Sequence, residues 1–463
     1  MLRLALRAFA AFLLLTSSLQ AFLAQPSPSR NTSEVTIQGT VQASDATPLL
    51  GARVDLRSGT SSDDVVMDTH TDIDGKFAIL SIPLAPGQYI LHVAAIGFES
   101  TEKAVDLRHA ASTASLNFVF TLRPAPKERG AASPYTKVRV FYATDRQAVS
   151  NQNTTQFLGI AAQNGALAYG ACDVSIPESH TLAALERPSI WKLEFHADPE
   201  KNIVLQKVTP EPKDLFLKDV AATVSGSPGK EAFVFVHGYN VSFEDAAVRT
   251  AQLTYDFGFK GAPIFYSWPS KGSLLGYLAD EISVAQTTAH LRQFLQDVAN
   301  TSGATTVHLI AHSMGNRALL TAVAQLASDN NFTNFNKFSS FVLAAPDVDR
   351  DEFTRLVSQI QKPRRKFTLY VSAHDQALEA SYLLFHREMR AGEGGSNAIV
   401  LPGLDTVDVS QLSSDALGHS YYGDNPSVVQ DLLKFLKGQL APRPSLSRVP
   451  LGSLAYWQLL PAK

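Results

Sequence analysis

The chain has 463 residues, of which 40 are basic and 43 acidic, giving a formal net charge of −3 at pH 7. Hydrophobic residues make up 45% and charged residues 18%, a balance that supports packed cores and argues against extensive disorder. The near-neutral charge argues against nucleic acid as a partner. A chain of this length is expected to form two or three domains.

Residues 1–24 are predicted to be a signal peptide. Two arginines precede the apolar stretch Ala8–Leu15, and Ala21 and Ala24 are small residues suited to cleavage. The apolar stretch is far shorter than the roughly 20 residues that a membrane-spanning helix needs. We therefore expect export to the periplasm or the medium, with an uncleaved membrane anchor as the alternative. The single cysteine, Cys172, cannot form an internal disulfide and is expected to be buried.

Residues 35–122 are predicted to form a small β-sandwich. Short alternating runs are separated by turn signals such as Asp74-Gly75 and Pro86-Gly87. The stretches "TPLLGARVDL", "TDIDGKF" and "PLAPGQYILHVAAIGFES" resemble the carboxypeptidase regulatory-like, transthyretin-like domain. The resemblance implies a seven-stranded sandwich without catalytic activity. We expect this domain to contact the cell envelope or another protein.

Residues 123–136 are rich in proline, glycine, alanine and charge and are predicted to be a linker. From 137 to 438 apolar strands alternate with amphipathic helices, which predicts an α/β domain whose sheet is mostly parallel and covered by helices on both faces. Residues 439–463 are predicted only as a tail. Sites in such sheets lie at the carboxyl ends of the strands.

The stretch "VHLIAHSMGNRALLTA" places a serine directly between a predicted strand and a predicted helix. Ala311-His312-Ser313-Met314-Gly315 is a nucleophile elbow motif with alanine in the first glycine position. Strand and helix cross closely at such a turn, so only small side chains fit at Ala311 and Gly315. The pattern predicts Ser313 as the nucleophile.

An earlier strand end supplies a candidate oxyanion hole. The sequence His237-Gly238-Tyr239 follows the apolar run "AFVFV", and a glycine there lets the backbone approach the nucleophile. We predict that the N–H groups of Tyr239 and Met314 bind the oxyanion, helped by the dipole of the following helix. His237 precedes the nucleophile in the chain and is predicted to be a structural loop residue.

A serine needs a histidine base, and an acid must orient that histidine. His419 lies in "DALGHSYYGD", between the last predicted strand and the last helix, and is the predicted base. Two carboxylates follow suitable strands: Asp375 is the preferred acid and Asp347 the alternative, with helix capping as the other role for Asp347 and Asp349. The sequence has no His-Glu-x-x-His motif and no phosphate-binding loop, so we expect no metal and no cofactor.

The motifs "RVFYATDR", "FVFVHGYN", "YSWPS", "LIAHSMGNRAL" and "GHSYY" resemble a bacterial alpha/beta-hydrolase family of unknown function, described as esterase/lipase-like. The resemblance extends from about Val138 to Leu436. It implies Ser313 as nucleophile and His419 as base, and it does not supply a substrate.

These observations predict an exported serine hydrolase that cleaves a small-molecule carboxylic ester through an acyl-enzyme. The alternatives are a thioesterase or amidase with the same triad, and a secreted binding module without catalysis. Trp268 and Tyr277 either line the acyl pocket or belong to the packing around it. No segment has the character of a lipase lid, which favours a soluble or small acyl ester. The sequence does not predict the oligomeric state.

Overall fold

The structure, a computed structural model, describes most of the chain from residue 33 onward. The predicted signal peptide, most of the predicted linker and the predicted base His419 lie outside the described residues. The described ranges are 33–49, 52–58, 65–72, 74–84, 86–95, 98–108, 113–124, 135–150, 155–186, 198–271, 277–361, 365–375, 377–378, 388–412 and 421–460.

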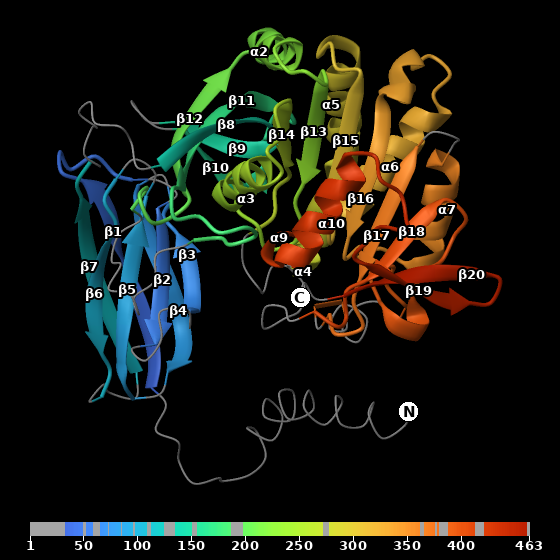
Figure 1. Ribbon diagram of the computed structural model, residues 1–463. Helices are drawn as coiled ribbons and strands as arrows, with labels where there is room; N and C mark the ends of the chain where they lie inside the picture. The colour runs from blue at the N-terminus through green and yellow to red at the C-terminus, as the bar shows by residue number, and fades with distance from the viewer. Residues whose placement is uncertain are drawn as a thin grey trace, which may run out of the picture.

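Two regions each have their own hydrophobic core. One cluster of buried side chains runs from Val35 to Leu122, and the buried members of the other two clusters all come from Val140 onward. Figure 1 shows the first region as a stack of blue and teal strands beside the larger region, whose sheet is flanked by helices. The described part of the chain therefore forms two domains with separate interiors.

The N-terminal domain is a sandwich of two sheets. One has the strand order β4-β1-β7 and the other β3-β2-β5-β6. Side chains such as Val35, Ile37, Val54 and Leu91 fill the space between them. These seven described strands agree with the predicted β-sandwich. Their bounds are β1 (Ser33–Ala43), β2 (Arg53–Ser58), β3 (Val65–His70), β4 (Lys76–Leu84), β5 (Gln88–Ala94), β6 (Thr101–Asp106) and β7 (Thr113–Leu122).

The second domain is built on an eleven-stranded sheet with the order β12-β11-β8-β14-β13-β15-β16-β17-β18-β20-β19. The strands from β8 to β20 in this order are parallel to one another. The outer pairs β11–β12, β8–β11 and β19–β20 are antiparallel. A two-stranded ribbon, β9 (Arg146–Ser150) and β10 (Thr155–Ala161), follows β8. The bounds in the sheet are β8 (Tyr135–Thr144), β11 (Ala168–Pro177), β12 (Val204–Glu211), β13 (Glu231–Val236), β14 (Ala262–Ser267), β15 (Thr306–His312), β16 (Phe338–Ala344), β17 (Lys366–Val371), β18 (Leu404–Asp408), β19 (Leu446–Leu451) and β20 (Leu454–Leu459).

Helices cover both faces of this sheet, which explains why its central strands are apolar throughout. Along β13, Val234 belongs to one core cluster, whereas its neighbours Phe233 and Phe235 belong to the other. Successive strand residues point to opposite faces, so a strand buried on both faces has no polar side. The helices are α2 (Lys213–Ser225), α3 (Phe243–Asp256), α4 (Tyr277–Gln286), α5 (Thr288–Thr301), α6 (Gly315–Ser328), α7 (Arg350–Ile360), α9 (Tyr421–Asp424) and α10 (Pro426–Leu436), with short 3₁₀ turns η3 (Thr333–Lys337) and η5 (Gly395–Asn397).

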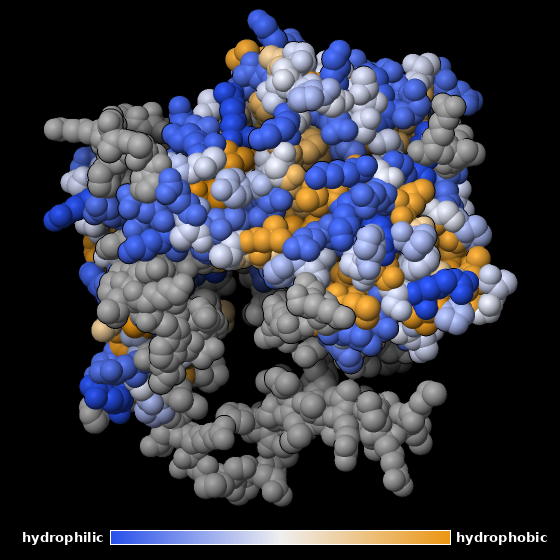
Figure 2. Space-filling model, viewed as in Figure 1, coloured by the Kyte–Doolittle hydropathy of each residue, from blue (hydrophilic) through white to orange (hydrophobic). Residues whose placement is uncertain are grey.

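The segment that the sequence predicted only as a tail extends the sheet. β20 pairs with β18 through Val407 and Trp457, and β19 folds back on β20 as an edge hairpin. Figure 2 shows apolar residues interspersed with charged ones over α10 and this hairpin. Arg443, just before β19, is fully buried and donates to both carboxylate oxygens of Asp431 at 2.8 Å. This buried ion pair attaches the C-terminal segment to α10.

Several smaller predictions concern single segments. Cys172 is fully buried, as predicted. The apolar pattern of residues 202–208 predicts a strand, and the strand observed there begins at Val204 and runs to Glu211. The sequence patterns also predict a strand in "IWKLEF" and a helix at 377–386; the strand and most of the helix lie outside the described residues. Within the parts of the chain that the structure describes, no helix has the length and apolar character needed to span a membrane.

Candidate active site

The turn between β15 and α6 has the backbone strain expected of a nucleophile elbow. β15 ends at His312 and α6 begins at Gly315, so only two residues connect them. Ser313 has φ +51° and is 3% exposed. A positive φ is uncommon for a residue other than glycine and persists only where its surroundings impose it. The Ser313 hydroxyl therefore lies on a strained turn at the carboxyl edge of the sheet.

Neighbouring segments hold this turn in place. The N–H of Ser313 donates to the carbonyl of Ala344 at the end of β16 at 3.0 Å, and the Ser313 carbonyl accepts from the N–H of Asp347 at 3.3 Å. The Asn316 side chain donates to both carbonyls, at 3.1 Å to Ser313 and 3.2 Å to Ala344. These bonds tie the elbow to the next strand and stabilise its strained conformation.

Two glycines bring the loop after β13 against the nucleophile. A Cβ on Gly315 would lie 2.3 Å from the His237 carbonyl oxygen, so strand β13 leaves no room for a side chain at the start of α6. A Cβ on Gly238 would lie 2.7 Å from the Cβ of Ser313. Ala311, which is paired with Val236 in the sheet, is also fully buried. The small residues of both motifs thus serve the close approach that the sequence predicted for them.

His237 is buried and neutral. Its Nδ1 lies 2.8 Å from the Gly238 carbonyl oxygen, which can only accept, so Nδ1 carries the proton. Nε2 then accepts from Ser267 Oγ at 3.1 Å and from the Arg146 guanidinium at 3.3 Å. Burial, together with the charge of Arg146, lowers the pKa of His237 to about 3. His237 is thus part of the loop structure and has no basic nitrogen directed to Ser313.

Trp268 lies beneath the same loop. Its indole stacks on the His237 ring with centroids 5.1 Å apart and planes at 15°, and its Nε1–H donates to the His237 carbonyl at 2.7 Å. The side chain is fully buried. Of the two roles considered for Trp268, the structure places it in the packing.

The two predicted oxyanion donors come from the turn that carries Ser313 and from the loop whose Gly238 packs against it. Met314 follows Ser313 directly and is the N-cap residue of α6, so its amide lies at the positive end of that helix. Tyr239 follows Gly238, and its ring makes an edge contact with the Tyr277 ring, with the ring centroids 5.5 Å apart. Burial, with a contribution from Asp280, raises the pKa of Tyr239 to about 12, so its phenol is neutral.

The preferred acid, Asp375, follows β17. Its side chain is 5% exposed, and one carboxylate oxygen accepts the N–H of Leu378 at 3.1 Å. In the sheet, β17 is next to β16 and two strands away from β15, the strand that leads to Ser313. A buried carboxylate that is oriented by the backbone is suited to hold an imidazole.

The alternative acid, Asp347, is already engaged by other side chains. Its Oδ1 accepts from Arg390 Nε at 2.9 Å and lies 3.5 Å from Arg317, while its Oδ2 accepts the Tyr277 hydroxyl at 2.7 Å. Both Asp347 and Arg390 are 2% exposed. Helix capping is performed by Asp349, which accepts from the N–H groups of Asp351 and Glu352, and not by Asp347.

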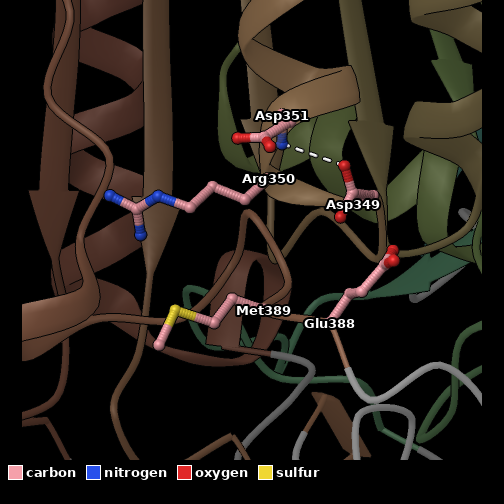
Figure 3. Close-up of a pocket in the computed structure, with 5 residues that line it drawn as sticks. All are labelled: Asp349, Arg350, Asp351, Glu388 and Met389. Carbon is pink, nitrogen blue, oxygen red and sulfur yellow. Dashed lines mark hydrogen bonds between the residues drawn. The ribbon is translucent and has the colours of Figure 1, made fainter.

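Figure 3 shows a pocket beside the start of α7, where the Asp351 N–H donates to the Asp349 carboxylate and the Arg350 side chain extends away from the acidic residues. Its lining contains none of the predicted catalytic or oxyanion residues. The pocket is lined by Asp349, Arg350, Asp351, Glu388 and Met389.

The predicted base, His419, lies outside the described residues, but the segment just after it is held close to the elbow. The Tyr422 ring stacks on His312 with centroids 4.4 Å apart. Arg249 of α3 pairs with Asp424 at 2.7 Å, and Gln252 donates to the Gly423 carbonyl at 2.8 Å. Residues 421–424 are thereby fastened beside the residue that precedes Ser313.

Sequence reasoning missed a polar cluster beneath the loop after β13. Arg146, Ser267, Ser270 and Asp280 are all buried there. The motifs "ATDR" and "SWPS" that contain three of them are the only sequence signal for this cluster. Over the ranges that the structure describes, no group of three or more His, Cys, Asp or Glu side chains is arranged to hold a metal ion.

A strained serine between a parallel strand and a helix, with a glycine-bearing loop against it, defines an α/β hydrolase. Residues 213–435 match the family model described as "Alpha/beta hydrolase of unknown function (DUF900)", and residues 36–121 match "Carboxypeptidase regulatory-like domain". The hydrolase part of the chain therefore matches the family that its motifs resemble, and a carboxypeptidase regulatory-like domain precedes it, in the predicted order.

An uncharacterized protein of Nostoc sp. (strain PCC 7120) is 22% identical, with 33% of this chain and 54% of that protein covered. The chain thus spans about half the length of this curated relative. Chlorocatechol 1,2-dioxygenase from Pseudomonas putida is 15% identical, with 21% of this chain and 63% of that chain covered and a TM-score of 0.16. A putative carbohydrate binding protein from Pseudomonas aeruginosa is 14% identical, with 20% and 92% covered and a TM-score of 0.15. At these TM-scores the two structural likenesses carry no argument.

Proposed function

We propose that this protein is an exported serine hydrolase that cleaves a small-molecule carboxylic ester, with Ser313 as nucleophile, His419 as base and Asp375 as acid. The observation that carries the proposal is the strained backbone of Ser313, at φ +51°, with Gly238 packed against its Cβ. Strain at a buried serine is costly and is expected where a hydroxyl must be held for attack.

The chemistry follows from these positions. His419 takes the proton of Ser313 Oγ as the oxygen attacks the acyl carbon, and the N–H groups of Met314 and Tyr239 bind the oxyanion that forms. The carbonyl re-forms, the alkoxide leaves with the proton from His419, and an acyl-enzyme remains on Ser313. Water then attacks the acyl carbon, His419 takes its proton, and Ser313 Oγ leaves with that proton as the acid product is released.

Asp375 is the acid in this proposal because the carboxylate of Asp347 is committed elsewhere. Two arginines and a tyrosine hydroxyl already bind both oxygens of Asp347. A carboxylate that neutralises buried guanidinium groups is a poor partner for an imidazole that must become cationic during the reaction.

Export through residues 1–24 and a cell-envelope or protein contact of the N-terminal sandwich belong to the same proposal.

The test uses the purified full-length protein and Ser313→Ala. Wild-type protein should react with a serine-directed fluorophosphonate and hydrolyse short p-nitrophenyl esters, whereas Ser313→Ala should do neither. A thioester and an anilide series of matched acyl groups would separate the esterase from a thioesterase or amidase. Wild-type protein that is no faster than Ser313→Ala on every substrate would contradict the proposal and favour a binding module.

A further inference from the structure

Arg146, from the motif "ATDR", occupies the centre of the polar cluster beneath the loop after β13. Its side chain is 2% exposed. Nε donates to Ser267 Oγ at 2.7 Å, and the two terminal nitrogens donate to the carbonyls of Ser270 at 2.9 Å and Val241 at 2.7 Å. A further contact, at 3.3 Å, reaches Nε2 of His237. One guanidinium thus joins the loop after β13 to the loop after β14.

The charge of Arg146 is compensated in an unusual way. Among the residues that the structure describes, no carboxylate lies within ion-pair distance of its guanidinium. Burial lowers the pKa of Arg146 to about 10, while Asp280, Asp145 and Asp245 act against this from further away, so the group stays cationic at neutral pH. A buried cation that contacts only carbonyls and neutral side chains contributes little to the stability of the fold, because no opposite charge offsets the cost of removing it from water. It is well suited to orienting a backbone, since a guanidinium presents five donors in a rigid plane.

A series of contacts connects Arg146, through His237, to the predicted oxyanion donor Tyr239. Arg146 and Ser267 occupy Nε2 of His237, which leaves the proton on Nδ1. Nδ1–H donates to the carbonyl of Gly238 at 2.8 Å. That carbonyl and the N–H of Tyr239 belong to the same peptide group, and in a planar trans peptide they point in opposite directions. Holding the carbonyl on the His237 side therefore aims the Tyr239 N–H away from it.

The loop is restrained on both sides of this peptide. Trp268 holds the His237 carbonyl, and Arg146 itself holds the Val241 carbonyl. Gly238 has no side chain and lies against the Cβ of Ser313. We propose that Arg146, acting through the Nδ1–H tautomer of His237, is the positioning residue for the oxyanion N–H of Tyr239. This inference rests on the proposed function and adds a residue that neither the triad nor the elbow includes.

Arg443 provides a matched control, because it is also a fully buried arginine but contacts Asp431 and Asp405, next to the C-terminal hairpin. We would compare Arg146→Lys with Arg443→Lys for kcat and KM on a p-nitrophenyl ester, for the thermal midpoint, and for inhibition by an aryl trifluoromethyl ketone. Such a ketone forms a tetrahedral oxyanion adduct with a nucleophilic serine and therefore reports on the oxyanion hole directly.

Arg146→Lys should lower kcat about 10- to 100-fold, less than the loss of a whole oxyanion donor, with KM within about threefold of wild type. Inhibition by the ketone should weaken in proportion to kcat/KM. Arg443→Lys should leave kcat and ketone inhibition within about twofold of wild type, whatever its thermal midpoint.

Two substitutions of His237 keep the test decisive where Arg146→Lys does not fold. His237→Asn retains an N–H donor near the Nδ1 position, whereas His237→Leu has none, so Asn should preserve most of kcat and Leu should lower it about 10- to 100-fold.

Wild-type protein no faster than Ser313→Ala would overturn the proposed function and this inference together. An active wild type whose kcat is unchanged in both Arg146→Lys and His237→Leu would overturn the inference alone. So would an activity loss that is equal in Arg146→Lys and Arg443→Lys.

Discussion

Buried polar groups are used in two different ways in the catalytic domain. Some form ion pairs that hold distant segments of the chain together, and we call these pairs clamps. Others bind the backbone near the strand ends that lead to the predicted site. In the clamps, charge meets opposite charge: Arg443 binds Asp431, and Asp347 binds Arg390. Beneath the loop after β13 and at the end of β17, polar groups bind the backbone: Arg146 binds carbonyls, and Asp375 accepts the N–H of Leu378. Opposite charges attach segments to one another, whereas contacts with the backbone orient individual peptide groups. We therefore expect substitutions in the ion pairs mainly to reduce stability and substitutions of the groups that bind the backbone mainly to reduce activity.

Asp375→Asn should have the largest effect on activity. Asparagine keeps the side-chain shape but cannot stabilise an imidazolium, so kcat should fall by about 10³- to 10⁴-fold with little change in unfolding free energy. Steady-state kinetics on a p-nitrophenyl ester and urea unfolding of the same preparation measure the two quantities. A kcat close to wild type would remove Asp375 from the triad.

Asp347→Ala should show the opposite pattern. It leaves Arg390, which is 2% exposed, without its carboxylate, and removal of one partner of a buried pair costs about 3–5 kcal/mol of unfolding free energy. The kcat of the folded fraction should stay within about tenfold of wild type, because hydrolysis needs only one acid. Asp351→Ala, an exposed substitution in the same segment, should change stability by less than about 0.5 kcal/mol. A greater loss of kcat in Asp347→Ala than in Asp375→Asn would reverse the assignment of the acid.

A third clamp makes stability depend on pH. His180 contacts Glu186 and Asp256, each at 2.8 Å. Burial alone lowers its pKa, but the hydrogen bonds and charges of Asp256 and Glu186 outweigh burial and raise the pKa to about 9. Because the folded-state pKa lies above the unfolded value near 6.5, this stabilisation is complete below pH 6.5 and is lost as the pH rises through 9.

The stability difference between wild type and His180→Asn should therefore shrink by up to about 3 kcal/mol between pH 6 and pH 9.5. Urea unfolding of both proteins across this range measures the difference. A difference that is constant with pH would show that His180 is not a charged clamp.

Trp268→Phe should have the smallest effect. Phenylalanine keeps the stacking on His237 but removes the N–H that donates to the His237 carbonyl at 2.7 Å. We expect a loss of about 1–2 kcal/mol in unfolding free energy and a three- to tenfold lower kcat, which is about 1 kcal/mol in the barrier. Trp457→Phe in β20 is the matched control and should leave kcat unchanged. Equal kcat values for the two variants would show that the Trp268 N–H does not help to position the loop after β13 for catalysis.

Local patterns predicted the sandwich, the parallel sheet and the elbow. The continuous apolar strands reflect burial on both faces of the sheet, and the small residues at Ala311 and Gly315 reflect a close crossing of strand and helix. Such requirements act on neighbouring residues and can be seen in a short window. The cluster around Arg146 could not be predicted in this way, because Arg146 and His237, which are in contact, lie 91 residues apart in the chain.

The fold class and the position of the strained serine could be predicted from the amino-acid pattern, because periodicity and side-chain size are local properties. Tertiary structure decided how the polar residues are used. It assigned Asp347 to Arg390, 43 residues further along the chain, and to Tyr277, 70 residues before it. It also made His237 neutral and joined β20 to β18. A charged or polar side chain takes its role from the groups that surround it, and in this molecule those groups come from distant parts of the chain.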